Sequence, residues 1–569
     1  MPIQRHLSYV QGVCSTPLIG QTIGDCFDEI AAEFSSHEAL VSLFENRRYT
    51  YQELCDEVNR CARALMALGI RKGDRVGLWS TNCTAWTVIQ FATAKIGAIL
   101  VNINPAYRLQ ELEYALNQSE CNCLISGERF RDADYAQMLQ QLIPELAVGD
   151  PTGNIQTSLF PQLRTLVFLK PTRDPETLSW REVMSWSDRV SEEALAERQS
   201  SLSFDDVINI QYTSGTTGFP KGAMLTHHNL LNNGYWTAQR MRFTHQDRLC
   251  IPVPFYHCFG MVAGNLACIT QGATMVLPAP HFSPLHTLQA VAQERCTALH
   301  GVPTMFIAEL DHPQFQEFDL SSLRTGIMAG APCPVEVMKR VMTEMNCREI
   351  TIACGMTEAS PICNMTEVDD PIELRVSTVG KVMPHQEQKI IDPATHKVLP
   401  RGQHGELCYR GYHVMRGYYN NAKGTREAID YAGWLHSGDL AVMDEQGYVK
   451  ITGRLKDMIC RGGEKIFPRE VEEFLFTHPK IAEAYVIGVP DDYYGEQVAA
   501  WIKVKEGMLL TEAEVCDFCR GQIMDYKIPR YVKFVCEFPT TVTGKVQKFR
   551  MREISAEELK ANSVGARIN

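Results

Sequence analysis

This 569-residue sequence lacks three features: an excess of positive charge, two closely spaced C-x-x-C pairs, and an uninterrupted apolar run long enough to span a membrane. Lys and Arg number 55 against 67 Asp and Glu, which gives a formal net charge of −12. Proteins that bind the phosphate backbone of nucleic acids usually present a basic surface. We therefore predict no nucleic-acid partner.

The twenty cysteines are scattered along the chain, and Cys516 and Cys519 form its one C-x-x-C pair. The common zinc motifs need a second pair nearby, so the pair is interpreted as two thiols on one helical face. The first residues, Met1 to His6, contain no apolar signal-peptide core. These observations favour reduced thiols and a cytoplasmic location.

No Asp, Glu, Lys or Arg occurs between Leu249 and Gln293, yet this stretch is not predicted to span a membrane. A spanning helix needs about 20 consecutive apolar residues. Here prolines and glycines interrupt the run, and Pro252, Gly260 and Pro278 are examples. The pattern indicates a buried strand–helix–strand passage; peripheral contact with a membrane surface stays open.

Hydrophobic residues make up 45% of the chain and charged residues 21%, which is typical of a soluble globular protein with a sizeable core. Short apolar runs alternate with helical patterns through the first half. Such alternation predicts an α/β fold built from βαβ units around largely parallel sheets. The predicted strands are Arg75–Trp79, Ala98–Asn102, Cys123–Ile125, Thr165–Leu169 and Val207–Gln211, and Ala85–Ile96 is a predicted helix.

The pattern of predicted elements changes near Gly453, where a compact α+β region begins. We therefore predict a large N-terminal domain over residues 1–453, a hinge at 454–457 and a small C-terminal domain over 458–569. The elements predicted in the small domain are helices Pro468–Thr477 and Glu512–Met524 and strands Ala484–Val489 and Val498–Val504.

The strongest local motif is the run Tyr-Thr-Ser-Gly-Thr-Thr-Gly-Phe-Pro-Lys-Gly at residues 212–222, directly after a predicted strand. Glycines let backbone amides approach an anion, hydroxyl groups add donors, and Lys221 adds a cation. The run differs from a P-loop because Pro220 precedes the lysine and Gly222 follows it. It nevertheless predicts binding of a polyphosphate.

The sequence resembles the adenylate-forming superfamily in five motifs. They are the run at 212–222, Cys-Gly-Met-Thr-Glu at 354–358, Ser-Gly-Asp at 437–439, Gly-Arg-Leu-Lys-Asp at 453–457 and Thr-Gly-Lys at 543–545. The motifs occur in that superfamily's order over roughly residues 25 to 550. Asn-Pro-Ala-Tyr at 104–107, Tyr-His-Cys at 256–258 and Lys-Phe at 548–549 resemble its medium-chain-type fatty acyl-CoA synthetases. The resemblance implies a mobile C-terminal domain and a two-step reaction through an acyl-adenylate.

The resemblance also implies roles for single residues. Glu358 would bind Mg²⁺, Thr357 would contact the α-phosphate, and Asp439 would accept hydrogen bonds from the ribose hydroxyls. Gly330 and Ala331 would lie along the adenine. The full set expected to bind ATP or AMP is Thr213, Ser214, Gly215, Thr216, Thr217, Gly218, Phe219, Pro220, Lys221, Gly330, Ala331, Gly355, Asp439 and Arg454.

The second step is expected to use a different face of the small domain. Lys545 would bridge the carboxylate and the α-phosphate in the first step and then leave, as the chain turns at Lys456. Gly462 and Gly463 would make room for the pantetheine arm of CoA. Catalysis is therefore assigned to Lys545, Thr357 and Glu358.

The acyl pocket is expected to include His257, Val302 and Phe306. At one position the sequence departs from the superfamily, because Cys354 stands where relatives carry an aromatic residue that stacks on adenine. We expect a fatty acid–CoA ligase for a medium- or long-chain acid, with ATP, Mg²⁺ and CoA as cofactor and co-substrates. An aryl-acid CoA ligase, an enzyme that loads a carrier protein, and a non-catalytic nucleotide binder are the alternatives. Oligomeric state stays open.

Overall fold

The computed structural model describes residues 6–145, 155, 157–170, 178–213, 220–331, 333–462, 464–491, 493–540 and 546–565. Packing divides the chain into two compact units. The larger unit comprises Val10–Gln388 and Tyr409–Leu435, and the smaller comprises Met1–Tyr9, Lys389–Cys408 and His436–Asn569. This division groups residues by packing and does not show where the chain bends, so the hinge at 454–457 stays a prediction.

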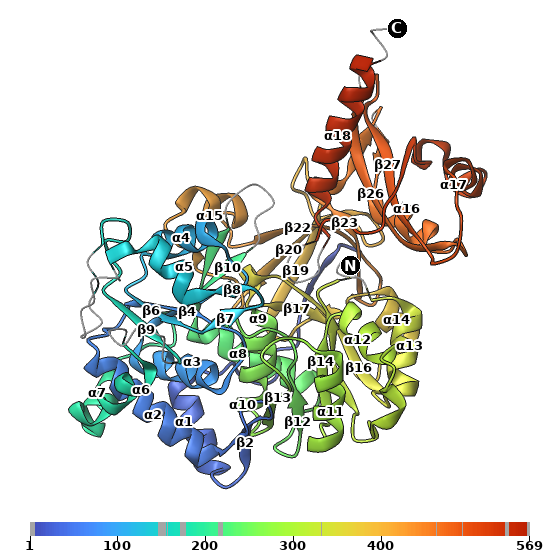
Figure 1. The fold of residues 1–569 in the computed structure, drawn as a ribbon. Coiled ribbons are helices and arrows are strands. Elements are labelled where there is room, and N and C mark those ends of the chain that lie inside the picture. Colours follow the sequence, from blue (N-terminus) through green and yellow to red (C-terminus); the bar gives the residue numbers. More distant parts are fainter. Residues whose placement is uncertain are drawn as a thin grey trace. The chain divides into compact units, whose positions relative to one another are not determined.

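Two sheets form the larger unit, and most of their strand pairs are parallel, as the sequence predicts (Figure 1). The seven-stranded sheet has the order β21 (Gly417–Tyr418), β11 (Lys221–Thr226), β10 (Val207–Thr213), β5 (Ile99–Ile103), β4 (Arg75–Trp79), β6 (Cys123–Ser126), β9 (Thr165–Phe168). The nine-stranded sheet has the order β18 (Lys381–Val382), β17 (Ile362–Met365), β16 (Glu349–Gly355), β15 (Thr325–Ala329), β14 (Ala298–Gly301), β12 (Arg248–Cys250), β13 (Thr274–Leu277), β2 (Glu38–Ser42), β3 (Arg47–Thr50). A small hairpin joins β7 (Arg129–Phe130) to β8 (Ala133–Asp134).

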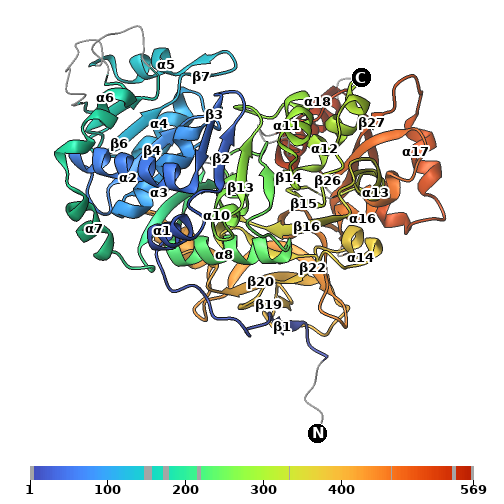
Figure 2. The ribbon, with the colours of Figure 1, turned by 90° about the horizontal axis from the view of Figure 1, so that it is seen from below.

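Helices cover these sheets, and Figure 2 shows α1, α2 and α3 packed together beside β4. Their ends follow local rules: Thr50 and Glu53 form a capping box at α2, and Gly97 ends α3 with φ of 72°. The α-helices are α1 (Ile23–Glu33), α2 (Tyr51–Ala67), α3 (Thr84–Ile96), α4 (Leu109–Gln118), α5 (Tyr135–Leu142), α6 (Trp180–Ser185), α7 (Glu192–Ser200), α8 (His227–Arg240), α9 (Cys258–Gly260), α10 (Ala267–Ile269), α11 (Pro284–Glu294), α12 (Pro303–Leu310), α13 (Val335–Glu344), α14 (Ile372–Ser377) and α15 (Ala422–Ala428). A π-helical turn, η3 (Met261–Leu266), joins α9 to α10, and 3₁₀ turns lie at η2 (Ser187–Arg189), η4 (Phe315–Glu317) and η5 (Thr357–Ala359).

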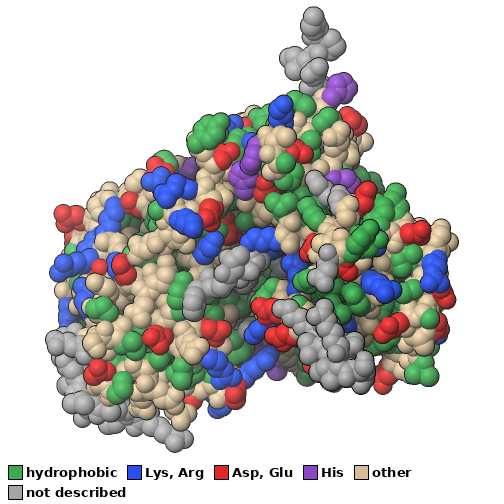
Figure 3. Space-filling view, turned by 90° about the horizontal axis from the view of Figure 1, so that it is seen from above, with side chains coloured by type: hydrophobic (Ala, Val, Ile, Leu, Met, Phe, Trp, Pro, Cys, Tyr) green, Lys and Arg blue, Asp and Glu red, His purple; other side chains and the backbone are tan. Residues whose placement is uncertain are grey.

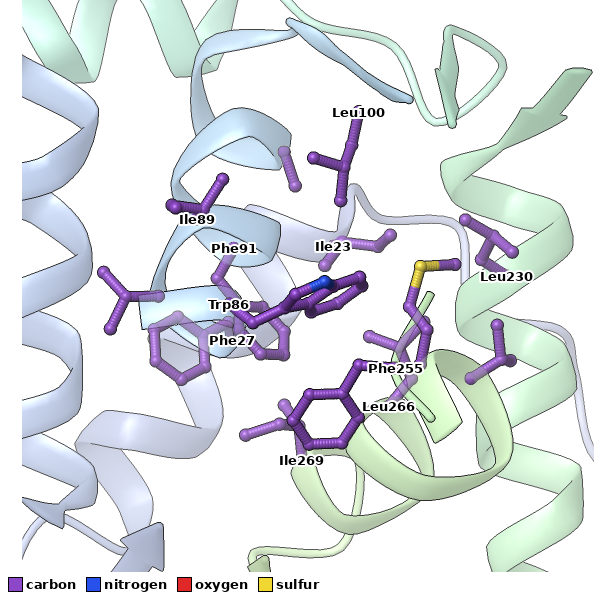
Figure 4. Packing of buried hydrophobic residues seen from close by; sticks show 14 of the residues in the cluster. Ile23, Phe27, Trp86, Ile89, Phe91, Leu100, Leu230, Phe255, Leu266 and Ile269 are labelled. Atoms are coloured by element: carbon purple, nitrogen blue, oxygen red, sulfur yellow. The ribbon is translucent and has the colours of Figure 1, made fainter. Parts of the chain in front are cut away.

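Aromatic rings pack among aliphatic side chains in a buried hydrophobic cluster of the larger unit (Figure 4). Phe27 of α1 stacks on Phe91 of α3 with ring centroids 4.8 Å apart, and Trp86 of α3 lies 5.3 Å from Phe255. Phe255 belongs to the uncharged stretch 249–293, which forms β12, the helix from α9 to α10, β13 and most of α11. The predicted buried strand–helix–strand passage is therefore confirmed, and no helix among the described residues is long and apolar enough to cross a membrane.

The smaller unit holds the greater part of a five-stranded sheet with the order β1 (Tyr9–Gln11), β19 (Gln386–Ile391), β20 (Gly405–Gly411), β22 (Leu435–Met443), β23 (Val449–Arg454). A second sheet has the order β25 (Glu464–Ile466), β24 (Ile459–Arg461), β27 (Gly495–Val504), β26 (Ile481–Asp491), with β28 (Tyr531–Phe534) paired to β27. The remaining helical elements are η6 (Leu455–Asp457), α16 (Pro468–Leu475), α17 (Glu512–Cys519), η7 (Asp525–Lys527) and α18 (Lys548–Gly565).

The predicted helix Glu512–Met524 is too long. Helix α17 ends at Cys519 because Arg520 takes an extended conformation and Gly521 has φ of +69°. All twenty cysteines are free thiols, in line with the interpretation of the sequence. Acidic and basic side chains are interspersed over the face seen in Figure 3.

We predict that Gly326→Ala strongly destabilises the larger unit. Gly326 has φ of +153°, and a Cβ there would lie 1.9 Å from the carbonyl oxygen of Leu299 on the neighbouring strand β14. Since backbone must move to relieve this overlap, a loss of about 3 kcal/mol is expected. Urea unfolding measures the loss, and Gly20→Ala is the control because a Cβ there meets no atom within 4 Å. Equal unfolding midpoints for the two variants would contradict the prediction.

Candidate active site

The flanks of the predicted phosphate-binding loop form an antiparallel pair. Strand β10 ends at Thr213, and Thr213 pairs with Lys221 at the start of β11. The hydroxyl of Tyr114 donates a hydrogen bond to the carbonyl of Pro220 at 2.9 Å. The remaining predicted loop residues lie outside the described residues; they are Ser214, Gly215, Thr216, Thr217, Gly218 and Phe219.

A tight turn carries Thr357 and Glu358 between strands β16 and β17. Gly355 ends β16, and a Cβ at this position would lie 1.9 Å from the carbonyl oxygen of Pro361. The turn closes when the backbone N–H of Met356 donates to the same carbonyl at 2.9 Å. Glu358 is 8% exposed, so its carboxylate sits in a largely buried place.

Residues 411–418 hold this turn from the other side. The N–H of Met415 donates to the backbone carbonyl of Glu358 at 2.9 Å, and the Ser360 hydroxyl donates to the carbonyl of His413 at 2.7 Å. The Tyr418 hydroxyl donates to Oε1 of Glu358 at 2.6 Å. The carboxylate predicted to bind metal is therefore oriented by a phenol that the sequence reasoning did not identify.

Tyr418 also brings the turn together with the hairpin of β10 and β11, which is predicted to bind phosphate. The Lys221 ammonium lies over the Tyr418 ring, 5.0 Å from its centroid. Burial and the charge of Glu358 raise the pKa of Tyr418, so the phenol stays a neutral donor. A cation and a carboxylate predicted to serve the same nucleotide thus contact one side chain.

The turn that carries His257 lies beside Thr357. The Thr357 hydroxyl interacts with the thiol of Cys258, whose pKa burial raises strongly. His257 caps α9, since its Nδ1 accepts a hydrogen bond from the N–H of Phe259 at 3.1 Å. The helix then passes through the π-helical turn η3, a feature that often marks functional sites.

Val302, Gly330 and Gly355 lie at or just after the carboxyl ends of β14, β15 and β16, which are adjacent parallel strands. Open α/β sheets bind ligands at this edge. A Cβ on Gly330 would lie 3.1 Å from Val302, so these two residues are neighbours, and Ala331 beside them is exposed. Phe306 is fully buried in a core cluster, with its ring against Gly301.

In the smaller unit, Asp439 and Arg454 face each other across strands β22 and β23. Arg454 Nε lies 3.2 Å from Asp439 Oδ1, and the two residues are paired in register. Lys456 is exposed in the 3₁₀ turn η6, and Gly462 has φ of +57° between β24 and β25. Gly463 and Lys545 lie outside the described residues, and their predicted roles stay predictions.

Family models match both parts of this chain. The model described as "AMP-binding enzyme" matches residues 27–419, and the model described as "AMP-binding enzyme C-terminal domain" matches residues 470–545. The latter range agrees with an α+β region at the C-terminal end.

Named relatives cover almost the whole chain. One is the "Putative acyl-CoA synthetase YngI" of Bacillus subtilis (strain 168), 49% identical over 96% of this chain and 99% of the relative. Another is the "Medium-chain acyl-CoA ligase ACSF2, mitochondrial" of Danio rerio, 43% identical over 97% of this chain and 91% of the relative.

Solved structures agree with the fold. ATP-bound MatB from Rhodopseudomonas palustris has a TM-score of 0.77 and 27% identity, over 93% of this chain and 98% of that one. The anthranilate CoA ligase AuaEII in complex with anthranoyl-AMP has a TM-score of 0.80 and 26% identity, over 96% of this chain and 99% of that one. The predicted α/β architecture with a smaller C-terminal domain is confirmed.

A buried histidine beside the turn should make stability depend on pH. Within the described part of the chain neither ring nitrogen of His413 has a hydrogen-bond partner, and burial lowers its pKa to about 3. The unfolded chain binds this proton near pH 6.5, so stability is complete above that pH and falls as the pH drops toward 3. His413→Gln should reduce this loss by up to about 1.4 kcal/mol per pH unit below 6.5.

Urea unfolding at several pH values between 7 and 5 measures this dependence. The control is His396→Gln, because His396 is exposed. Identical pH dependence in the wild type and in His413→Gln would show that this imidazole is not held neutral by the fold.

Proposed function

Since this chain belongs to the AMP-binding enzyme family, we propose that it is an ATP-dependent fatty acid–CoA ligase that acts on a medium- or long-chain acid. The first step joins the carboxylate to AMP and releases pyrophosphate. The second transfers the acyl group to the thiol of CoA and releases AMP. The curated relatives named acyl-CoA synthetase and medium-chain acyl-CoA ligase support this assignment.

The observation that carries the proposal is the convergence of Lys221, Tyr418 and Glu358 in the larger unit. Adenylation places negative charge on the α-phosphate and on the departing pyrophosphate. Catalysis of phosphoryl-group chemistry is mostly positioning and charge stabilisation. A lysine next to the predicted phosphate-binding loop supplies positive charge for the phosphates, and a carboxylate held at a fixed place can bind a metal ion that supplies more.

The residues at the turn fit a magnesium ion. Mg²⁺ takes oxygen ligands and is usually bound through one or two carboxylates together with substrate phosphates. The Glu358 carboxylate is of this type, and the Thr357 hydroxyl lies one residue away on η5. When bound, the ion would neutralise phosphate charge, while Glu358 would hold it and Thr357 would donate to the α-phosphate.

Further roles are proposed on the resemblance of the motifs. Gly330 and Ala331 would lie along the adenine, and Gly355 would belong to the nucleotide site. Asp439 would bind the ribose, and Arg454 would reach the ribose or a phosphate. Lys545 would stabilise the adenylation step, Lys456 would be the pivot for a turn of the small domain, and Gly462 and Gly463 would admit the pantetheine arm. His257, Val302 and Phe306 would form part of the acyl pocket.

The proposal predicts pyrophosphate release that depends on a fatty acid. Purified protein with MgATP should release pyrophosphate with a straight-chain saturated acid, and the acyl group should then pass to free CoA. The assay compares a ladder of saturated acids with aryl acids, each with CoA or with a carrier protein as acceptor. Preference for aryl acids, or transfer to the carrier alone, would replace the proposal with the matching alternative.

A second prediction separates the two half-reactions. Lys545→Ala should lower pyrophosphate release by about two to three orders of magnitude, since removing one transition-state donor has that effect. Thioester formation from a supplied acyl-adenylate should change by less than about threefold, because Lys545 is assigned to the first step alone. Lys505→Ala, which alters an exposed lysine of the same unit, is the control. Equal losses in both half-reactions would contradict the assigned role.

A further inference from the structure

We propose that Tyr418 is a positioning residue for adenylation: it holds the Glu358 carboxylate in place and keeps Lys221 apart from it. This inference rests on the proposed function and adds a residue that none of the predicted motifs contains. Its support comes from contacts within the larger unit.

The contact to the carboxylate is short and well buried. Tyr418 is 7% exposed and Glu358 is 8% exposed, and their oxygens are 2.6 Å apart. Hydrogen bonds to an ionised carboxylate are shorter and about twice as strong as neutral ones. Because the phenol engages Oε1, it fixes the orientation of the carboxylate and leaves Oε2 as the oxygen to meet a cation.

The backbone of Tyr418 has little freedom. Strand β21 pairs with β11, with Tyr418 opposite Ala223, and the N–H of Tyr418 donates to the Thr425 hydroxyl at 2.9 Å. The next residue continues the contact, since the N–H of Tyr419 donates to the carbonyl of Gly222 at 2.8 Å. The phenol is therefore anchored to the strand that begins at Lys221.

The ring separates two opposite charges. Lys221 lies over its face at 5.0 Å from the centroid, and Glu358 lies at its hydroxyl edge. A direct ion pair would occupy the lysine and the carboxylate with each other. A cation on an aromatic face is attracted to the ring and keeps its charge. The arrangement thus reserves the ammonium for phosphate and the carboxylate for a metal ion.

Tyr418→Phe tests the hydrogen bond without removing the ring. A hydrogen bond to a charged group contributes enough that its loss should reduce the rate of pyrophosphate release by about ten- to a hundredfold. The Mg²⁺ concentration at half-maximal rate should rise by a similar factor, whereas thioester formation from supplied acyl-adenylate should stay within about twofold. Calorimetric titration of MgATP, at several Mg²⁺ concentrations, should show the same weakening without turnover.

Tyr419→Phe is the matched control. It removes the neighbouring phenol, whose hydroxyl donates to Glu120 at the surface, and it should leave all three measurements unchanged. Tyr418→Leu removes the ring as well and should reduce pyrophosphate release further than Tyr418→Phe.

The outcomes separate this inference from the proposed function. A wild-type protein that releases no pyrophosphate with any acid overturns the proposed function. An active wild type in which Tyr418→Phe leaves the Mg²⁺ dependence unchanged, or in which both half-reactions fall in parallel with the melting temperature, overturns the positioning role. A raised Mg²⁺ requirement, with an unchanged melting temperature and unchanged thioester formation, supports the positioning role.

Discussion

The hydrogen bond from Tyr418 to Glu358 joins two sheets. Tyr418 belongs to β21 of the seven-stranded sheet, and Glu358 lies in the turn between β16 and β17 of the nine-stranded sheet. Sixty residues separate the two partners. The site in the larger unit therefore forms only when both sheets have folded and docked. A substitution that destabilises either sheet should therefore lower the activity even where it alters no reacting group.

Buried polar side chains also connect parts of the larger unit through hydrogen bonds. Asn102 on β5 donates to Gln211 of β10 at 3.1 Å, and Asn209 of β10 donates to Asn102 at 2.9 Å. Gln211 in turn donates to the backbone carbonyl of Tyr256, just before His257. Buried polar groups are costly unless they are satisfied, so such a network fixes one arrangement of the parts it joins. These residues place the His257 turn relative to strand β10, which leads into the predicted phosphate-binding loop.

The sequence carries enough information to predict the local elements but not the contacts between distant ones. Continuous apolar runs such as Arg75–Trp79 gave the buried strands within one or two residues, because burial on both faces leaves that pattern. The motifs at 212–222 and 354–358 pointed to Lys221 and Glu358 as candidate site residues. Tyr418 was missed because Lys221 and Glu358 are far from it in sequence and no motif contains it. The end of α17 was missed because Gly521 sets it, and the residues before Gly521 continue the helical pattern.

The choice of a phenol at position 418 follows from the charges around it. An arginine or lysine there would also donate to Glu358, but it would pair with the carboxylate and weaken its hold on a cation. A carboxamide would donate but could not carry Lys221 on an aromatic face. Burial and the nearby carboxylate raise the pKa of Tyr418, so its proton stays on the oxygen at neutral pH and the donor role persists. A neutral, flat and buried donor is therefore the side chain that can orient Glu358 without cancelling its charge, while it supports a lysine of opposite charge on its face.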